Sequence, residues 1–265
     1  MRFDVITLFP ELFAPFLTSG VTRRAFESGL VDVKLWNPRD FADGNYRRVD
    51  DRPFGGGPGM VMLADPLALC LEQIFADRRT QSESHAPDAP VVLFSPIGKA
   101  LDHAGVEAWS ASSGAVLICG RYEGLDQRFI DSHVDVQISL GDFVLSGGEI
   151  VAMALLDAVA RLQPGVLNDE GSHQFDSFNP ALDGLLDCPH YTRPDVWREQ
   201  SVPAPLLSGN HAYIERWRRD QRLALTHKQR PELVVAARDA GQLSRTDEVF
   251  LATLTENTLL STKLL

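Results

Sequence analysis

Short apolar runs alternate with helical patterns along the first part of the chain. Four such runs, rich in β-branched residues and flanked by glycine or proline, have the length and composition of buried strands: Phe3 to Phe9, Val31 to Trp36, Val91 to Phe94 and Val116 to Cys119. Between the second and third runs, Asp65-Pro66 combines an N-cap residue with a proline at the first helical position and predicts a helix through about Asp77. Strands separated by helices predict an α/β fold with a mostly parallel sheet.

The periodicity changes in the second half of the chain. A strongly apolar segment, Glu149 to Leu162, predicts a helix buried on most sides that ends at Pro164-Gly165. Earlier, Arg78 to Pro90 contains hardly any large apolar residue and predicts a solvated loop. From Gly165 to about Ser208, proline, glycine and small polar residues occur without sustained periodicity. A connection this long is usually a functional segment or a linker, so we expect the domain boundary within it.

Only helical patterns follow this irregular stretch. They cover His211 to Leu225, Pro231 to Ala240 and Asp247 to Leu259. The sequence therefore predicts an α/β domain over residues 1–164, a linker over 165–208 and a small all-helical C-terminal domain over 209–265.

Composition narrows the class of protein. With 265 residues, 44% of them hydrophobic, the chain can form one large domain, or one plus a small one. No stretch reaches about 18 uninterrupted apolar residues, and the N-terminus does not have the pattern of a leader, so a soluble, cytoplasmic protein is expected. Cys70, Cys119 and Cys188 lie far apart without CxxC spacing, which predicts buried thiols instead of disulfides or structural zinc.

The net charge of -11 argues against a nucleic-acid binder, but the local charge differs. Residues 211–230 contain six Lys or Arg against two acidic residues, a net charge of +4. This stretch predicts a basic patch on an acidic body, although a solvated helix face would give the same pattern. The candidate RNA contacts are Arg216, Arg218, Arg219 and Arg222.

Glycine-rich loops are the candidate ligand sites. Gly55 to Gly59 lacks both the GK[ST] and the GxGxxG pattern, which excludes a nucleotide-hydrolase loop and favours a tight turn. Gly120 to Gly124 and Leu140 to Gly148 both follow apolar runs, and ligands of open α/β sheets bind outside the carboxyl ends of strands. These two loops could wall one pocket, with exposed backbone groups for an adenine edge or a ribose and Leu140 and Leu145 over the adenine face.

The ordered set of motifs GRYEGLD, LGDFVLSGGE, PGVL, DSF, LLDCPHYTRP and LLSGNH is more specific than any single piece. Because it carries these motifs in this order, the chain closely resembles the bacterial tRNA (guanine-N1)-methyltransferase family of the TrmD type, in the SPOUT class. The match runs from Leu8–Glu11 through Gln229–Glu232. The resemblance implies a SPOUT α/β fold with a C-terminal trefoil knot, a flexible linker, a helical domain and a homodimer with composite active sites. No pattern in the residues reveals a knot, which is rare among proteins.

The resemblance also implies a reaction, the methylation of N1 of guanosine 37 in the tRNA anticodon loop with S-adenosylmethionine as donor. It assigns the general base to Asp176 and an assisting arginine to Arg161. The donor site maps onto Leu93, Phe94, Ser95, Gly98, Gly120, Tyr122, Glu123, Ser139, Leu140, Gly141, Asp142, Phe143, Val144, Leu145, Gly147 and Gly148.

These residue types suit the chemistry. Guanine N1 carries a proton that a carboxylate can remove, and an arginine can stabilise the charge that develops at O6. The sulfonium donor is already activated, so in-line positioning is the remaining task and no metal is required. Members of the family are reported to respond to magnesium, but the sequence shows no dedicated carboxylate cage, so magnesium stays open as a second cofactor.

Alternatives remain for each assignment. Arg161 could form a helix salt bridge with Asp157 at i, i+4, and Asp176 could be an ordinary loop aspartate or N-cap. Ile97, Phe143 and Val151 replace a glutamine, a tyrosine and a proline of the family pattern, and the first two affect hydrogen bonds of the donor pocket. A non-catalytic RNA-binding protein is disfavoured by the presence of both candidate catalytic residues. The DSF and PHYTRP motifs disfavour a SPOUT methyltransferase that acts on another RNA.

Overall fold

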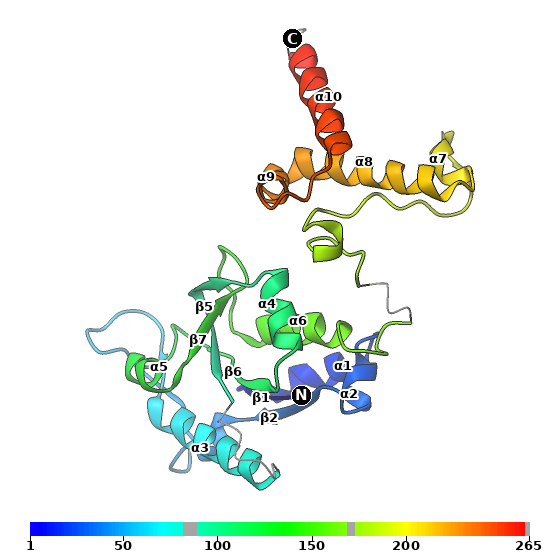
Figure 1. The fold of residues 1–265 in the computed structure, drawn as a ribbon. Coiled ribbons are helices and arrows are strands. Elements are labelled where there is room, and N and C mark those ends of the chain that lie inside the picture. Colours follow the sequence, from blue (N-terminus) through cyan, green and yellow to red (C-terminus); the bar gives the residue numbers. More distant parts are fainter. Residues whose placement is uncertain (82–88, 169–172, 263–265) are drawn as a thin grey trace. The chain divides into compact units, whose positions relative to one another are not determined.

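A computed structural model describes residues 1–81, 89–168 and 173–262 and divides the chain into two compact units, Met1–Asn168 and Asp169–Leu265. Unit 1 contains a five-stranded sheet of order β2-β1-β6-β5-β7 in which every pair of neighbours is parallel (Figure 1). The strands are β1 (Arg2–Ile6), β2 (Asp32–Trp36), β5 (Val91–Ala100), β6 (Gly114–Ile118) and β7 (Val136–Ser139). The predicted α/β class with a parallel sheet is confirmed.

Helices cover both faces of this sheet. The first face is covered by α1 (Phe13–Thr18), α2 (Arg23–Glu27), α4 (His103–Ser110) and α6 (Glu149–Arg161), and the second by α3 (Ala64–Gln81) and α5 (Gln127–His133). Along β1, Phe3 and Val5 join the core of the first face, whereas Ile6 joins that of the second, as strand alternation requires. Outside the sheet, β3 (Asp50–Asp51) pairs with β4 (Val61–Met62), and η1 (Pro10–Leu12) and η2 (Pro38–Phe41) are short 3-10 helices.

Strand β5 is longer than predicted. The expected strand ended at Phe94, but β5 continues to Ala100 and pairs with β7 twice, with a shift in register between Phe94 and Lys99. Pro96 lies within this bulge, where a strand tolerates a residue that lacks a backbone N–H. Strand β7 was not predicted, because the polar residues Gln137 and Ser139 interrupt its apolar residues and leave no apolar run.

Helix α3 also departs from the prediction at both ends. It begins at Ala64, so Asp65 lies in its first turn and is not the N-cap. It continues to Gln81, so the predicted loop is wrong for residues 78–81, and residues 82–88 lie outside the described ranges. The end of the helix is held by polar contacts, since Nε of Arg78 donates a hydrogen bond of 2.6 Å to the fully buried carboxylate of Asp4. Apolar periodicity cannot reveal such an anchor.

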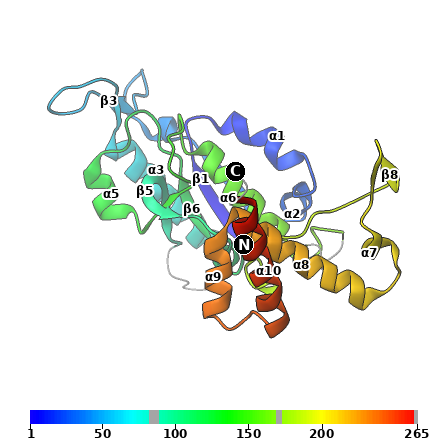
Figure 2. The same ribbon diagram turned by 90° about the horizontal axis from the view of Figure 1, so that it is seen from above.

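Unit 2 contains three long helices where the sequence predicts them: α8 (His211–Gln229), α9 (Pro231–Asp239) and α10 (Arg245–Thr262). Helices α9 and α10 both pack against α8 (Figure 2). Before them, the described residues 173–210 contain short elements: η3 (Pro180–Leu182), the hairpin strands β8 (Val196–Trp197) and β9 (Gln200–Ser201), and α7 (Ala204–Leu207). Leu185 of that segment is fully buried and shares a core with Leu223 and Val234, which anchors the segment to the helices of unit 2.

The structure also bears on the cysteines and on the hydrophobicity of the helices. Cys70, Cys119 and Cys188 are buried free thiols, as predicted. Within the described ranges, no helix has both the length and the hydrophobicity that crossing a membrane requires.

Candidate functional site

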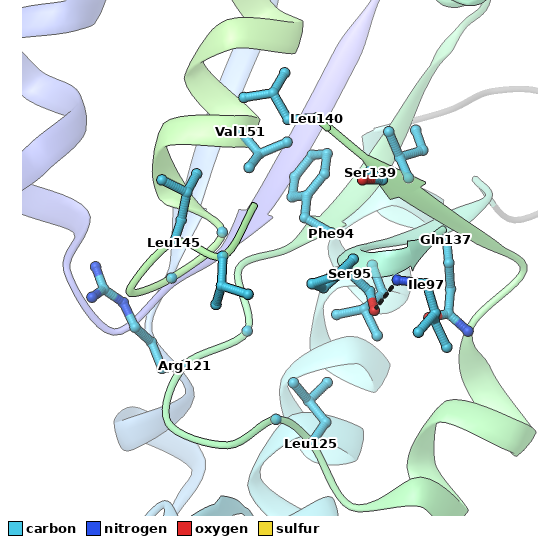
Figure 3. A pocket seen from close by; sticks show the side chains of 18 of the residues that line it. Phe94, Ser95, Ile97, Arg121, Leu125, Gln137, Ser139, Leu140, Leu145 and Val151 are labelled. Carbon is cyan, nitrogen blue, oxygen red and sulfur yellow. Dashed lines mark hydrogen bonds between the residues drawn. The ribbon is translucent and has the colours of Figure 1, made fainter. Parts of the chain in front are cut away.

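A pocket of about 380 Å³ opens at the carboxyl ends of β5, β6 and β7 (Figure 3). Three chain segments form its walls: the bulge of β5, the loop that follows β6 and the loop that follows β7. The strands are parallel, so their carboxyl ends meet at one edge of the sheet, where ligands of α/β folds bind. The two glycine-containing loops singled out in the sequence therefore do wall one pocket.

The structure gathers nearly all predicted donor-site residues around this pocket. Those that line it are Leu93, Phe94, Ser95, Gly120, Tyr122, Glu123, Ser139, Leu140, Gly141, Phe143, Val144, Leu145, Gly147 and Gly148. Gly98 and Asp142 are not among the lining residues. Gly98 instead allows a close approach of strands, because a Cβ there would lie 2.5 Å from the backbone carbon of Gln137.

The pocket has an apolar side and a polar side. Phe94, Leu145 and Val151 group on the side of α6, where Phe94 and Val151 belong to the core of that face and Leu145 packs against it (Figure 3). The hydroxyl of Ser139 accepts a hydrogen bond of 3.2 Å from the backbone N–H of Gly141 and fixes the turn out of β7. Such a mixture suits a ligand with a planar base and a polar tail.

Some lining residues were missed by the sequence analysis. Arg121, Leu125, Ile130 and Gln137 contribute to the walls. Arg121 lies inside the GRYEGLD motif, so its place in the motif could have indicated it. Gln137 lies on the unpredicted strand β7, and no signal in the sequence indicates its position.

Three departures from the family pattern lie at this pocket. Ile97 is 82% exposed at the rim, where it makes an apolar edge instead of the amide of the glutamine expected from the resemblance. Phe143 is more than half exposed and lacks the phenolic hydroxyl of the expected tyrosine. Val151 is buried among the apolar lining residues.

Cys119, which follows β6 next to the pocket, is not a reactive thiol. Cys119 precedes Gly120 and is fully buried, and this burial raises the pKa of its thiol well above the ordinary value. Since the thiolate is the nucleophilic form, Cys119 is an inert core residue.

The proposed catalytic residues belong to different units. Arg161 is the last residue of α6 in unit 1. One turn earlier, the carboxylate of Asp157 accepts a hydrogen bond of 3.0 Å from the hydroxyl of Thr22, which joins α6 to the segment before α2.

Asp176 is half-buried in a turn of unit 2. The backbone N–H of Asn179 donates to the carbonyl of Asp176 (3.2 Å), and Phe178 adopts a left-handed conformation with φ of 72°. The hydroxyl of Ser177 accepts a hydrogen bond of 2.9 Å from the backbone N–H of Asp187. The turn that carries Asp176 is therefore fixed by contacts within its own unit.

The four arginines predicted to contact RNA all pair with carboxylates of unit 2. Arg216 and Arg219 both bind Asp247, at 2.9 and 3.2 Å. The side chain of Arg218 is 45% exposed, in contrast to those of Arg219 and Arg222, which are 18% and 11% exposed. The arginines with little exposure hold unit 2 together, and Arg218 is the most accessible of the four to a phosphate.

A metal site does not emerge from the side chains described. Among residues 1–80, 89–168 and 173–254, whose side chains the structure describes, no three His, Cys, Asp or Glu form a group that could hold a metal ion. Nothing in the described part of the chain thus indicates where magnesium would bind.

Comparison with known proteins decides the family. The family model described as tRNA (Guanine-1)-methyltransferase TrmD matches residues 1–236 of the chain. The chain belongs to this TrmD family. A tRNA (guanine-N(1)-)-methyltransferase of Polaromonas sp. (strain JS666 / ATCC BAA-500) is 79% identical over 257 residues, which cover 97% of this chain and 98% of the relative. The enzymes of the same name from Paracidovorax citrulli and Bordetella pertussis are 74% and 56% identical, each over 96% of this chain and 98% of the relative.

Membership confirms the family predicted from the motifs and the class of enzyme, a methyltransferase. Residues of the chain's GRYEGLD and LGDFVLSGGE motifs line the same pocket.

Proposed function

We propose that the chain transfers a methyl group from S-adenosylmethionine to N1 of guanosine 37 in the anticodon loop of tRNA. The observation that carries this proposal is the pocket at the carboxyl ends of β5, β6 and β7, whose walls include residues of the GRYEGLD and LGDFVLSGGE motifs. The tRNA substrate and the modified atom follow from the names of relatives that are up to 79% identical over almost the full chain.

The pocket fits the donor by size and chemistry. Its volume of about 380 Å³ lies within the range of about 300 to 1,000 Å³ that is usual for small-molecule sites. The apolar side formed by Phe94, Leu145 and Val151 suits the adenine face, and the hydroxyl groups and glycine backbone suit the ribose and the amino acid part. When bound, the donor supplies an electrophilic methyl group on a sulfonium, and the chain has to hold that methyl in line with the nucleophile.

Asp176 and Arg161 serve the guanine. The carboxylate of Asp176 accepts the proton of N1, which leaves the lone pair of N1 free to attack. The guanidinium of Arg161 stabilises the negative charge that develops on O6. Neither role needs a metal ion.

The proposal includes the knot and a homodimer. After β7 the chain returns to the loop that follows β6, since the backbone N–H of Gly148 donates to the carbonyl of Gly120 (3.0 Å) and Arg121 bridges to Gly147. The knot itself, a passage of the chain through the loop between β5 and β6, is proposed from the family resemblance. Because Asp176 belongs to the second unit, a two-fold dimer allows one subunit to supply the pocket and its partner the base.

The experiment that tests this function uses a donor with a labelled methyl group. The full chain is incubated with the donor and a tRNA mixture, and the labelled nucleoside is then isolated and its methylated atom determined. We expect label on N1 of guanosine in tRNAs that carry guanosine at position 37. Tight RNA binding without any transfer of label would support a non-catalytic RNA-binding protein, and label on a ribose or on another base would support a different SPOUT activity.

A further inference from the structure

Glu149 is a buried carboxylate next to the pocket that does not line it. It is the first residue of α6, and its side chain is 1% exposed. The hydroxyl of Thr7, just after β1, donates a hydrogen bond of 2.9 Å to its Oε1. A buried carboxylate is costly unless it is paired, so its partners indicate why the chain keeps it there.

The main partner is Arg121, which does line the pocket. Its Nε donates to Oε1 of Glu149 (3.1 Å), and its Nη2 lies 2.8 Å from Oε2. Its Nη1 donates to the carbonyl of Ser146 (3.1 Å), and its guanidinium lies 4.4 Å from the ring centre of Phe9. One guanidinium thus joins the loops after β1, β6 and β7, with Glu149 fixing its orientation.

Two glycines make room for this arrangement. A Cβ on Gly147 would lie 2.2 Å from Nε of Arg121, and a Cβ on Gly148 would lie 2.8 Å from Cα of Cys119. Both glycines line the pocket, so the close approach that brings the two walls together also shapes the cavity.

We propose that Glu149 is a positioning residue for the methyl donor, which acts through Arg121 to hold the two glycine loops of the pocket in their binding geometry. The inference rests on the proposed function for the identity of the ligand. It follows from the placement of the pair, because each of the loops after β6 and β7 that Arg121 ties together contributes several lining residues. Preorganised loops bind a ligand without a cost for ordering them.

The test compares donor binding by calorimetry with steady-state kinetics for Glu149→Gln in the full chain. The amide keeps the shape of the side chain but loses the ion pair. We expect the donor Kd and the donor KM to rise by about 3-fold to 30-fold, the usual range for residues that act on a site without touching the ligand. At saturating donor, kcat and the KM for tRNA should change by less than about twofold, since the guanine side is untouched.

Further variants distinguish a specific effect on donor binding from a general loss of stability. Arg121→Lys retains the positive charge but lacks the forked guanidinium that pairs with the carboxylate of Glu149. Its donor Kd should lie between those of the wild type and Glu149→Gln. The double variant Glu149→Gln/Arg121→Lys should be no worse than the worse of these two single variants, because the pair acts as a unit. The matched control is Asp4→Asn, which breaks a buried pair with Arg78 that involves no lining residue. It should lower thermal stability and leave the donor Kd unchanged.

An unchanged donor Kd in folded Glu149→Gln and Arg121→Lys, with thermal stability lowered as in Asp4→Asn, would overturn the inference and leave Glu149 a structural residue. This result can be distinguished from a failure of the proposed function. A wild-type chain that binds the donor but methylates no tRNA contradicts the proposed function, while the calorimetric comparison still decides the role of Glu149.

Discussion

Nε of Arg222 lies 3.4 Å from Oδ1 of Asp187, and the backbone N–H of Asp187 donates to the hydroxyl of Ser177, the neighbour of Asp176. Helix α8 is thereby joined to the turn that carries the proposed base. An arginine that the sequence predicts as a phosphate contact therefore has a structural partner inside unit 2. The two roles lead to different expectations for variants of α8.

The first prediction separates these roles. Arg218→Gln should weaken tRNA binding, because Arg218 is exposed and its pairing with Glu215 is weak in water. The slope of the logarithm of the binding constant against the logarithm of the salt concentration should become shallower by about 0.7 to 0.9, the effect of one lost phosphate contact. Arg222→Gln should instead lower turnover, because it loosens the turn at Asp176, with a smaller change in slope. The measurement is tRNA affinity from about 50 to 200 mM salt. If neither variant changes the slope, the arginine face of α8 is merely solvated.

The second prediction concerns the base. Asp176→Asn should lower single-turnover methyl transfer by about a hundredfold to ten-thousandfold, the usual contribution of a positioned base. Donor binding by calorimetry should stay nearly unchanged, because Asp176 is proposed to act on the guanine and is not among the residues that line the pocket. Normal turnover by this variant would show that another group removes the proton.

The third prediction concerns acid stability. Burial of Asp247 opposes its ionisation, but hydrogen bonds from Ser244 and the guanidinium groups of Arg219 and Arg216 outweigh this and lower its pKa to about 2. The pKa of this carboxyl in the unfolded chain is the ordinary value, near 4. Because the pKa is lower in the folded chain, the ionised carboxylate stabilises the fold fully above about pH 4. This stabilisation is lost as the pH falls through about 2, and it amounts to about 2 kcal/mol.

Urea unfolding of the full chain measures this. The free energy of unfolding of the wild type should fall between pH 4 and pH 2 more steeply than that of Asp247→Asn, which cannot lose the ion pairs again. The control is Glu248→Gln, whose partner Arg238 is nearly half exposed, and it should behave like the wild type. Equal pH slopes for Asp247→Asn and the wild type would contradict the role given to Asp247.

The fourth prediction concerns composite sites. Asp176→Ala removes the base, and Gly141→Trp blocks the pocket, where even a Cβ would lie 2.9 Å from the ring of Phe143. When the two inactive variants are mixed and allowed to exchange subunits, about half of the dimers should be heterodimers. If each active site is shared between two subunits, every heterodimer contains one complete site. Activity should return to about a quarter of the wild-type level. Lasting inactivity after verified exchange would mean that each site is built within one chain.

The sequence predicts those parts of the fold that depend on local pattern. Helices α6, α8, α9 and α10 and the first strands have clear periodicity, and the motif loops lie at strand ends, so the pocket walls could be anticipated. The bulge that lengthens β5 and the anchor between Arg78 and Asp4 depend on tertiary contacts and have no local signal.

The same limit applies to charge. Counting residues 211–230 gives a basic patch, but it cannot show that Asp183, Asp187 and Asp247 reach the arginines from other segments. Nor does a helical pattern indicate that Glu149 at the start of α6 pairs with Arg121 at the end of β6. Both relationships join residues far apart in the sequence.

The most direct test of the account compares two anticodon stem-loops that differ only at position 37. The full chain is given labelled S-adenosylmethionine with a stem-loop that carries guanosine or adenosine at that position, and transfer is followed in a single turnover. The account predicts rapid formation of N1-methylguanosine in the first and no transfer to the second. Equal labelling of both, or label at any atom other than N1, would contradict it.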